Sequence, residues 1–402
     1  RKKLLIYINP PYAEADNRKG EGRRGVAESL IHKKYGDLLG KAKRELFAQF
    51  FIRISKEIHG CFLGEFSTLK HLQASNFAQF RNVFNAKLEK MFIVPADTFD
   101  NVKGQFPIGF VIFNLSENAR FNNTTSNVYN ANGVELANKH IACYDNAKLI
   151  NDWAKTFKAN DKVKDSIATI TAIASDFQHC NTVCIEKPYK KVAADNHHWQ
   201  ITLDNLIESS IYYSVRKVIP ATWLNDRDQF LYPNDGWKED KEFQSDCLAY
   251  TLFNNNIQSQ HGINFWIPFT EEEVDAKDNF KSHFMTNFMA GKVKQEPRAM
   301  TLDFGVVAEE SKSEKIEFSD KAKVVMDAGR ELWKYYHAQP NANVDASYYD
   351  IREHFQGRDE KGKMNSSSTD ETYNCLLGNL REALKVLAKK IEPKVYEYGF
   401  LK

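Results

Sequence analysis

The 402-residue sequence lacks several features that define whole classes of protein. No apolar run reaches the roughly 20 residues that span a bilayer, and no secretory signal is visible, so we expect a cytoplasmic protein without a membrane partner. Its six cysteines lie far apart in the sequence, at positions 61, 143, 180, 184, 247 and 375. This spread is typical of reduced thiols and argues against a disulfide framework. A phosphate-binding loop ending in Lys-Ser or Lys-Thr is also missing, which argues against an ATP motor.

A strong overall charge is missing too, because the formal net charge is only +2. The distribution is uneven: residues 1–60 contain 14 Lys and Arg against 7 Asp and Glu. Part of this charge lies in a polar, glycine-rich segment, residues 13–36, which predicts a mobile loop. A basic segment of this kind suits a phosphate backbone, although a solvated basic face with no partner explains the charge equally well. The candidate DNA contacts of this loop are Arg18, Lys19, Arg23 and Arg24.

The most informative stretch is Asn9-Pro10-Pro11-Tyr12, which directly follows the apolar run Leu4 to Ile8. A short unbroken apolar run predicts a buried parallel strand. Two prolines end that strand and stiffen the turn, because each fixes φ and lacks an N–H. The turn therefore holds an amide and an aromatic ring at the carboxyl end of a strand, which is where ligands bind in open α/β sheets.

Such a turn suits methylation of an exocyclic amino group. The lone pair of adenine N6 is delocalised into the ring, which makes N6 a poor nucleophile. The Asn9 side-chain oxygen and the Pro10 carbonyl could accept both N–H bonds and so localise that lone pair. Tyr12 could stack on a base that has left the helix, as base-modifying enzymes require. The alternative interpretation is a proline-rich strand end without a catalytic role.

The tetrapeptide resembles motif IV of the amino-methyltransferases that use S-adenosylmethionine. It is most similar to that of the N6-adenine DNA methyltransferases of restriction-modification systems, of the type IIG or ISP-like kind. The resemblance implies that Asn9, Pro10, Pro11 and Tyr12 are catalytic, with Tyr12 stacking on the flipped adenine. It also implies S-adenosyl-L-methionine as cofactor and double-stranded DNA as partner. A restriction endonuclease domain or subunit often accompanies such enzymes.

The order of elements up to residue 117 fits the same resemblance. We predict a helix over 37–58, a strand over 60–66, a helix over 68–84 and paired strands over 91–94 and 106–113. This order is that of the second half of a doubly wound, Rossmann-like α/β sheet. It is similar to the motif V to VIII portion of the family, which implies that Phe99 is a second aromatic residue against the base. Phe106 is a rival, and packing within a hairpin is an alternative role for either ring.

The cofactor half of the family, with its glycine-bearing loop, is not recognisable. Leu302-Asp303-Phe304-Gly305 comes nearest but lacks the second glycine and the strand context. We therefore expect the main S-adenosyl-L-methionine motif to lie upstream of Arg1. This chain alone is expected to be inactive and to bind the cofactor poorly.

From residue 118 the composition changes, and the polar stretch 121–127 predicts a linker. We interpret 1–117 as the carboxyl-terminal half of the catalytic domain, 118–319 as an α+β target recognition domain and 320–402 as a helical region. Helices are predicted over 204–219 and 320–338, and from a Ser368–Glu371 capping box to Pro393. Arg227 lies in a dense polar and aromatic loop, residues 222–232. Its side-chain type pairs with base edges, although a plain surface turn is an alternative.

No metal site is predicted. Cys180 and Cys184 with His197 and His198 suggest zinc, but the finger pattern needs a second histidine where Ile201, Thr202 and Leu203 stand.

Taken with the resemblance of Asn9 to Tyr12, the sequence favours a site-specific DNA adenine-N6 methyltransferase. Two alternatives remain open: a methyltransferase acting on RNA or on a protein glutamine, and a DNA-binding specificity module without activity of its own.

Overall fold

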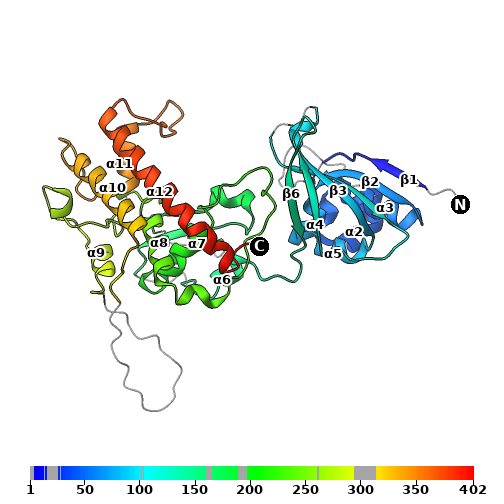
Figure 1. Cartoon of the computed structure of the whole chain (residues 1–402), viewed down its shortest axis with the longest axis horizontal. Helices are drawn as coiled ribbons and strands as arrows, with labels where there is room; N and C mark the ends of the chain where they lie inside the picture. Colours follow the sequence, from blue (N-terminus) through cyan, green and yellow to red (C-terminus); the bar gives the residue numbers. More distant parts are fainter. Residues whose placement is uncertain are drawn as a thin grey trace, which may run out of the picture. The chain divides into compact units, whose positions relative to one another are not determined.

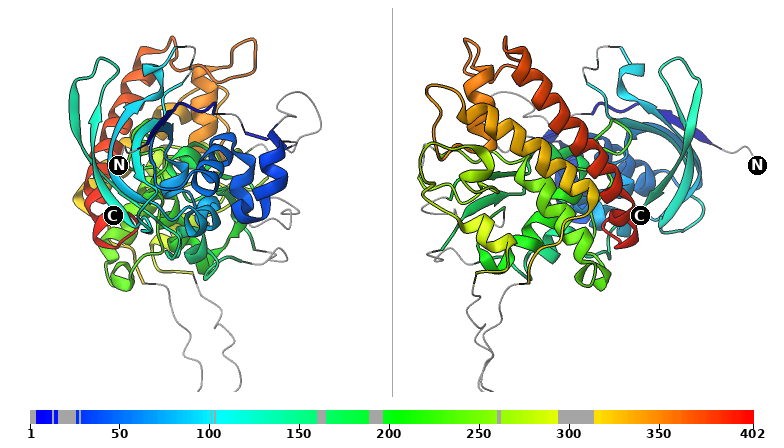
Figure 2. Two further views of the ribbon diagram at one scale, coloured as in Figure 1. Left: turned by 90° about the vertical axis from the view of Figure 1, so that its right-hand side faces the viewer. Right: turned by 60° about the vertical axis from the view of Figure 1, so that its left-hand side comes forward.

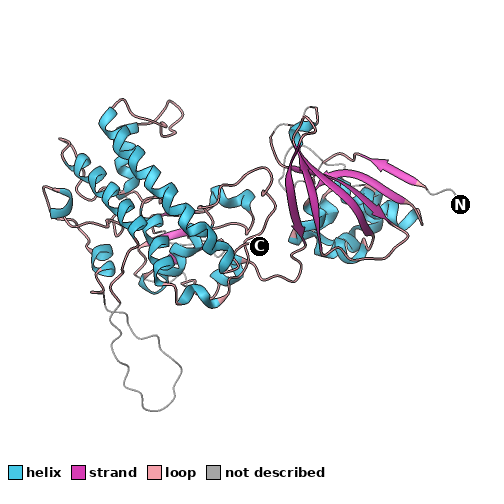
Figure 3. Cartoon of the chain, in the orientation of Figure 1, coloured by secondary structure: helices cyan, strands magenta, loops and turns pink. Residues whose placement is uncertain are grey.

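The structure is a computed structural model that describes residues 4–12, 14–15, 26–27, 29–100, 102, 104–159, 165–188, 197–259, 262–293 and 314–402. The chain forms two compact units (Figure 1). Unit 1 comprises Arg1–Ala147 with two short returns, Asp176–Gln178 and Ala221–Gln229. Unit 2 comprises Lys148–Ser175, His179–Pro220 and Phe230–Lys402. The fold is of the mixed α/β class, with most strands in unit 1 and most helical residues in unit 2 (Figure 3).

Unit 1 is built on a six-stranded mixed sheet with the order β1-β2-β4-β3-β5-β6. Strand β1 is parallel to β2, and β3 is parallel to β5, while the other neighbours are antiparallel. The six strands are β1 (Leu5–Ile8), β2 (Phe62–Thr68), β3 (Lys87–Pro95), β4 (Pro107–Asn114), β5 (Asn123–Tyr129) and β6 (Glu135–Ala142). The strands expected at 60–66, 91–94 and 106–113 are thus present as β2, β3 and β4.

The helices of unit 1 pack against one face of the sheet (Figure 2). They are α2 (Leu30–Leu39), α3 (Leu46–Glu57), α4 (Lys70–Gln73) and α5 (Ala78–Val83). Side chains alternate between the two faces of a strand, so every second residue points at the helices. Leu63, Val111 and Phe113 do so and are buried in one core with Phe47 and Phe51 of α3. Helices cover one face, and the opposite face carries a smaller aromatic cluster.

Strand β1 differs from the sequence expectation of a buried strand. It is parallel, but it lies at the edge of the sheet and pairs only with β2 among the described strands. Leu5 and Tyr7 are 64% and 63% exposed. The apolar run indicated burial because both faces of a central parallel strand are covered, whereas here one edge and one face of β1 remain uncovered.

The prediction of a linker over 121–127 is also wrong, because strand β5 begins at Asn123. Ser126 and Val128 face the sheet's interior and are fully buried, while their neighbours are polar and exposed. This alternation is a strand signal that the Asn and Thr content hid. Strands β5 and β6 complete the sheet, so the compact unit reaches Ala147 and not residue 117.

The early helices are shorter than predicted. The segment expected as a loop over 13–36 contains the start of α2, where the Ser29 side chain accepts a hydrogen bond from the His32 N–H at 2.9 Å. The single helix expected over 37–58 is divided at Gly40, whose φ of 56° ends α2. The helix expected over 68–84 is likewise divided into α4, a 3₁₀ turn and α5.

Unit 2 combines a small antiparallel sheet, in the order β8-β7-β9, with helices. Its largest fully buried side chains include Trp199, Tyr212, Phe253 and Trp333. No helix in the described ranges is long and apolar enough to cross a membrane. The strands are β7 (Ala168–Thr171), β8 (Cys184–Glu186) and β9 (His198–Ile201), and the helices are α6 (Ile150–Ala154), α7 (Leu206–Val215), α8 (Lys241–Leu252), α9 (Phe284–Met289), α10 (Asp320–His337), α11 (Tyr348–Gln356) and α12 (Glu371–Glu397).

The long helices of unit 2 follow the sequence closely. Helix α10 matches the prediction over 320–338, and α7 lies within 204–219. Helix α12 begins one residue after Asp370, whose carboxylate accepts from the Tyr373 N–H at 2.8 Å, so the expected Ser368–Glu371 capping box does not form. The helix also continues past Pro393 to Glu397. Proline lacks the N–H that would bond the carbonyl four residues earlier, but the buried side chains of Ile391 and Val395 hold the helix on both sides of Pro393 along the chain.

Candidate active site

The turn Asn9–Tyr12 leaves the sheet at the carboxyl end of β1. In the parallel register of β1 and β2, Ile8 lies opposite Glu65, and Asn9 follows directly. Pro10 is buried, Asn9 and Pro11 are exposed, and Tyr12 is partly buried. The buried proline anchors the turn while the Asn9 amide is presented to solvent.

The Asn9 amide and the Tyr12 ring contact each other. The Tyr12 hydroxyl donates a hydrogen bond of 3.0 Å to Asn9 Oδ1. Burial, with smaller contributions from Glu65 and Tyr7, raises the pKa of Tyr12, so its hydroxyl keeps the proton that it donates. Among the described residues no hydrogen bond reaches the Pro10 carbonyl, which leaves this oxygen available as an acceptor.

The chain is held again just after the turn. The Ala15 N–H donates to the Arg44 carbonyl at 2.8 Å, within an antiparallel bridge of Glu14 with Glu45. Lys70 Nζ lies 2.5 Å from a carboxylate oxygen of Glu45 and 3.4 Å from one of Glu14. Because Glu45 is only 4% exposed, this ion pair is shielded from water, and the turn is fixed at both ends.

Aromatic residues from four strands and one loop form the uncovered face beside the turn. We call Tyr7, Phe66, Phe92, Phe99 and Phe110 the aromatic face. The Phe66 ring lies at its centre, with centroids 4.8 Å from Phe110, 5.2 Å from Phe99, 6.0 Å from Phe92 and 6.4 Å from Tyr7. Such separations are typical of stabilising aromatic pairs.

Tyr12 and Phe99, the two residues expected to stack on a base, belong to one apolar cluster with Phe66. Phe106 lies in the same cluster, so the two rival positions are neighbours. The sequence did not single out Tyr7 or Phe66. On β1 and β2 these two residues alternate with residues that face the helices, and this alternation could have placed them on the opposite face of the sheet. Only the sheet order, however, brings them beside Phe99.

A second feature lies under the turn, on the side of the helices. Glu65 and His71 are 0% and 1% exposed, and His71 Nε2 lies 3.5 Å from Glu65 Oε1. Neither Glu65 oxygen nor His71 Nε2 has a hydrogen bond of ordinary geometry. Burial raises the pKa of Glu65 well above its usual value and lowers that of His71 to about 3. His71 is therefore neutral near pH 7, and burial favours the protonated, neutral form of Glu65.

The tautomer of His71 follows from its contact with the Thr68 carbonyl. His71 Nδ1 lies 3.0 Å from the Thr68 carbonyl, so it must carry the ring proton and donate it. Nε2 is then unprotonated and lies 3.5 Å from Glu65 Oε1, and burial favours the neutral, protonated form of that carboxyl. The rings of Phe47, Phe51 and Phe113 surround His71. Sequence analysis missed both residues, although a glutamate inside the apolar run of β2 was a signal.

Of the five predicted DNA contacts, the structure describes only Arg227. Arg18, Lys19, Arg23 and Arg24 lie outside the described residues. Arg227 is described, and its guanidinium donates to Gln178 Oε1 at 2.5 Å and lies 3.1 Å from Asp226. A phosphate or base that contacts Arg227 would have to compete with these two partners.

The described residues fit the substrate side of a methyl-transfer site better than the cofactor side. They offer two carbonyl acceptors and several ring faces. Beside Asn9 they contain no glycine-bearing strand-to-helix turn, which would let a backbone approach a nucleotide-like cofactor closely. Glu65, the nearest buried acid, is on the face covered by helices. These residues therefore do not by themselves form an S-adenosyl-L-methionine site.

Comparisons with known proteins add little to this geometry. No protein-family model matches the chain, and no curated protein matches it. Among solved structures, the chain is similar to the Type IIL restriction-modification enzyme MmeI in complex with DNA, with a TM-score of 0.28 and 10% identity. The alignment covers 98% of this chain and 56% of that one, so the chain spans little more than half of its length. A TM-score of 0.28 is too low to indicate a shared fold, and the function rests on the residues of this chain.

Proposed function

We propose that unit 1 is the substrate-binding part of a DNA adenine-N6 methyltransferase of a restriction-modification system. The observation that carries the proposal is the turn at the end of β1. There, the Asn9 amide oxygen lies beside Tyr12, whose ring shares a cluster with Phe99, and no described residue donates a hydrogen bond to the Pro10 carbonyl. S-adenosyl-L-methionine would supply the methyl group when it is bound.

The two oxygens account for the activation of the amino group. Each can accept one N–H of adenine N6, which draws the lone pair out of conjugation with the ring. The Asn9 oxygen has two lone pairs, and the Tyr12 hydroxyl uses only one of them. The exposed position of Asn9 and the rigidity of the two prolines keep the acceptors oriented before a base arrives.

The aromatic residues account for the binding of a flipped base. A base outside the helix loses its stacking partners, and an aromatic ring restores about 1–3 kcal/mol of that interaction. Tyr12 is partly exposed next to the acceptors, and Phe99 is the cluster member expected on the other side of the base. Unit 2 would carry the target recognition domain and the helical region.

The test is a methyl-transfer assay with tritiated S-adenosylmethionine and the full-length protein, offering DNA, RNA and protein as acceptors. Asn9→Ala should abolish labelling of DNA and leave DNA affinity largely intact, because phosphate contacts carry most of that affinity. Asn85→Ala is the matched control, since Asn85 is exposed on unit 1 and has no hydrogen bond among the described residues. Label in RNA or in a protein glutamine would refute the DNA assignment, and near-normal turnover of Asn9→Ala would refute the role of the turn.

A further inference from the structure

Unit 2 contains a cavity of about 410 Å³ that plays no part in the proposed chemistry of unit 1. Its walls come from the segment that follows α7, from α8 and the residues just after it, and from helices α11 and α12. This volume lies within the range of small-molecule sites, which is roughly 300–1,000 Å³.

The cavity is strongly cationic. Four of its lining residues are basic, namely Lys217, Arg352, Arg381 and Lys385, and no lining residue is a carboxylate. Among the described residues only Lys385 has an acidic partner, Glu382, one turn back on α12 at 3.1 Å. In the described part of the chain, the other three form no ion pair. Cations that face one cavity without counter-charges repel each other, so an anion that enters would be stabilised by all of them.

Lys217 is the most enclosed of the four. Its Nζ donates to the Cys180 carbonyl at 2.7 Å and lies 5.7 Å from the centroid of the Tyr213 ring. Burial lowers the pKa of Lys217. The chain thus keeps a partly desolvated ammonium group at the cavity wall with only neutral partners, which costs free energy unless a negative charge compensates it.

The two arginines converge on one tyrosine. The Arg352 guanidinium lies 5.5 Å from the centroid of the Tyr348 ring, and its Nε donates to Gln356 Oε1 at 3.2 Å. Burial raises the pKa of Tyr348, and Arg352 and Arg381 both act against that rise. The charges of both arginines are therefore close to the same hydroxyl, and among the described residues Arg352 makes its side-chain hydrogen bond through Nε, which leaves its two terminal nitrogens for a ligand.

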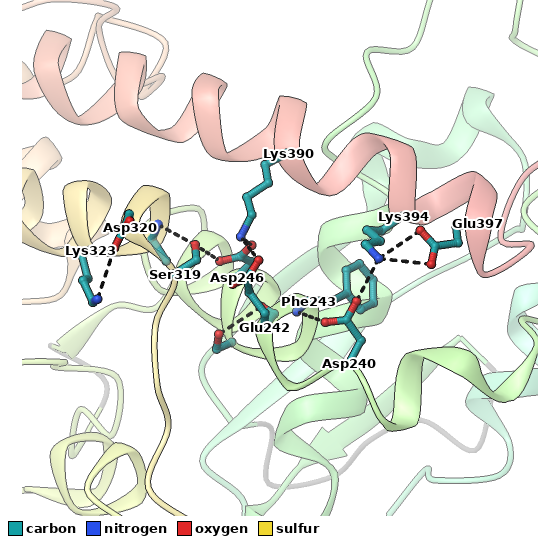
Figure 4. A network of polar contacts seen from close by, with 12 residues as sticks. Asp240, Glu242, Phe243, Asp246, Ser319, Asp320, Lys323, Lys390, Lys394 and Glu397 are labelled. Carbon is teal, nitrogen blue, oxygen red and sulfur yellow. Dashed lines mark hydrogen bonds and ion pairs between the residues drawn. The ribbon is translucent and has the colours of Figure 1, made fainter.

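A polar network holds α12 in place next to the cavity (Figure 4). Lys390 Nζ lies 2.6 Å from Asp246 and 2.6 Å from Glu242 of α8, and Lys394 lies 3.1 Å from Asp240. On α12 this network begins at Lys390, two residues beyond the cavity's last lining residue, Ala388. The backbone that carries Arg381 and Lys385 is therefore positioned before a ligand binds.

The rest of the cavity wall is largely apolar. Val218, Pro220, Leu384 and Ala388 line it, together with the side chains of Tyr250 and Asn254. A bare inorganic ion would leave these apolar residues without contacts. A ligand with an anionic group on a compact organic part would contact both the basic and the apolar residues of the cavity.

We propose that this cavity binds the phosphate group of a nucleotide-sized ligand. Phosphate fits better than a single carboxylate because it carries more charge and more acceptor oxygens, and the planar guanidinium of arginine matches its geometry. The phosphate can come from a free nucleotide or from a nucleotide unit of DNA. The site is independent of the proposed methyl transfer, because it lies wholly within unit 2.

The test is calorimetric titration of the full-length protein with uridine 5′-monophosphate, with uridine, and with a short DNA duplex. A uracil nucleotide avoids confusion with an adenine site in unit 1. We expect the monophosphate to bind in a salt-dependent manner and uridine to bind at least tenfold more weakly. Arg352→Gln and Arg381→Gln should each weaken the monophosphate at least tenfold. Arg381 is exposed, so its replacement leaves the fold intact.

Lys389→Gln is the matched control, because Lys389 is an exposed cation of α12 that does not line the cavity. If the arginine variants weaken only the duplex, the phosphate is that of DNA and the site stands. The proposal is overturned if uridine binds as well as its monophosphate, or if neither variant changes the affinity for either phosphate probe. Asn9→Ala should not affect monophosphate binding, so failure of the methyl-transfer proposal can be recognised separately.

Discussion

The Tyr12 hydroxyl donates a 3.0 Å hydrogen bond to Asn9 Oδ1, so the two most chemically important side chains of the turn are already joined without a substrate. One lone pair of the amide oxygen is thus occupied, and the hydrogen bond holds the Tyr12 ring beside Asn9. The hydroxyl and the ring of Tyr12 therefore have different roles, and mutations can test each role separately.

Tyr12→Phe and Tyr12→Ala separate these properties. Phenylalanine keeps the ring and releases the Asn9 oxygen, so methyl transfer should stay within about threefold of wild type. Alanine removes the ring, and the loss of about 1–3 kcal/mol of stacking should lower kcat/KM roughly 5- to 150-fold. Steady-state kinetics on a DNA substrate measures both. Equal damage by the two replacements would show that the hydroxyl, and not the ring, is what matters.

Glu65→Gln should stabilise unit 1 above neutral pH. Folded Glu65 keeps its proton above pH 4.5, whereas the unfolded chain releases it, so the unfolding free energy falls by about 1.4 kcal/mol per pH unit up to the raised pKa. Glutamine can donate to His71 Nε2 and does not titrate. Denaturant unfolding at about pH 5 and about pH 8 should show a smaller decline for the variant. An unchanged decline would mean that Glu65 is ionised in the folded protein.

His71 acts at the other end of the pH range. Its pKa is lowered to about 3 by burial, so between pH 6.5 and pH 3 the unfolded chain takes up a proton that the folded chain does not. Stability should therefore fall as the pH drops through this window. His71→Phe should remove that acid sensitivity, measured as the unfolding midpoint against pH, whereas an identical acid profile would place its origin elsewhere.

Asp145→Asn should destabilise unit 1 by about 3–5 kcal/mol, because it leaves the buried Arg81 without its counter-charge. Arg81 Nε donates to Asp145 at 3.0 Å, and both side chains are less than 5% exposed. This pair joins α5 to the segment after β6 and so closes the unit. Asp37→Asn, at an exposed position of α2, should stay within about 0.5 kcal/mol in the same unfolding experiment. Equal midpoints for the two variants would contradict this.

Two glycines of unit 2 should respond to alanine with opposite signs. A Cβ at Gly329 would lie 2.3 Å from Cε1 of the fully buried Phe253, and overpacking of this kind costs about 1–3 kcal/mol. Gly378 is exposed in α12 with no atom within 4 Å of its added Cβ, so Gly378→Ala should stabilise the helix by up to about 1 kcal/mol. Melting temperatures of the two variants should therefore move in opposite directions.

The sequence predicted elements well where one periodicity was undisturbed. Helix α10 and the strands β2 to β4 follow from local patterns of apolar residues. Strand β5 was missed because its polar residues face solvent, and the exposure of β1 could not be predicted because burial depends on which strands become neighbours. Local signals carry no information about sheet order.

The same limit applies to the candidate site. Asn9 and Tyr12 are three residues apart, so their proximity follows from the turn itself. The approach of Phe99 to this turn depends on β2 lying between β1 and β4. The cationic cavity was not predicted at all, since Lys217 follows α7 while Arg352 and Arg381 lie on α11 and α12, far from it in sequence.

The edge position of β1 also has a consequence for handling the protein. Its outer side presents backbone N–H and C=O groups that pair with no described strand, next to the exposed side chains of Leu5 and Tyr7. An open apolar edge is a template for a strand of another chain. For this 402-residue chain on its own, association through β1 should therefore limit solubility, and Leu5→Lys should raise the concentration at which the chain remains monodisperse.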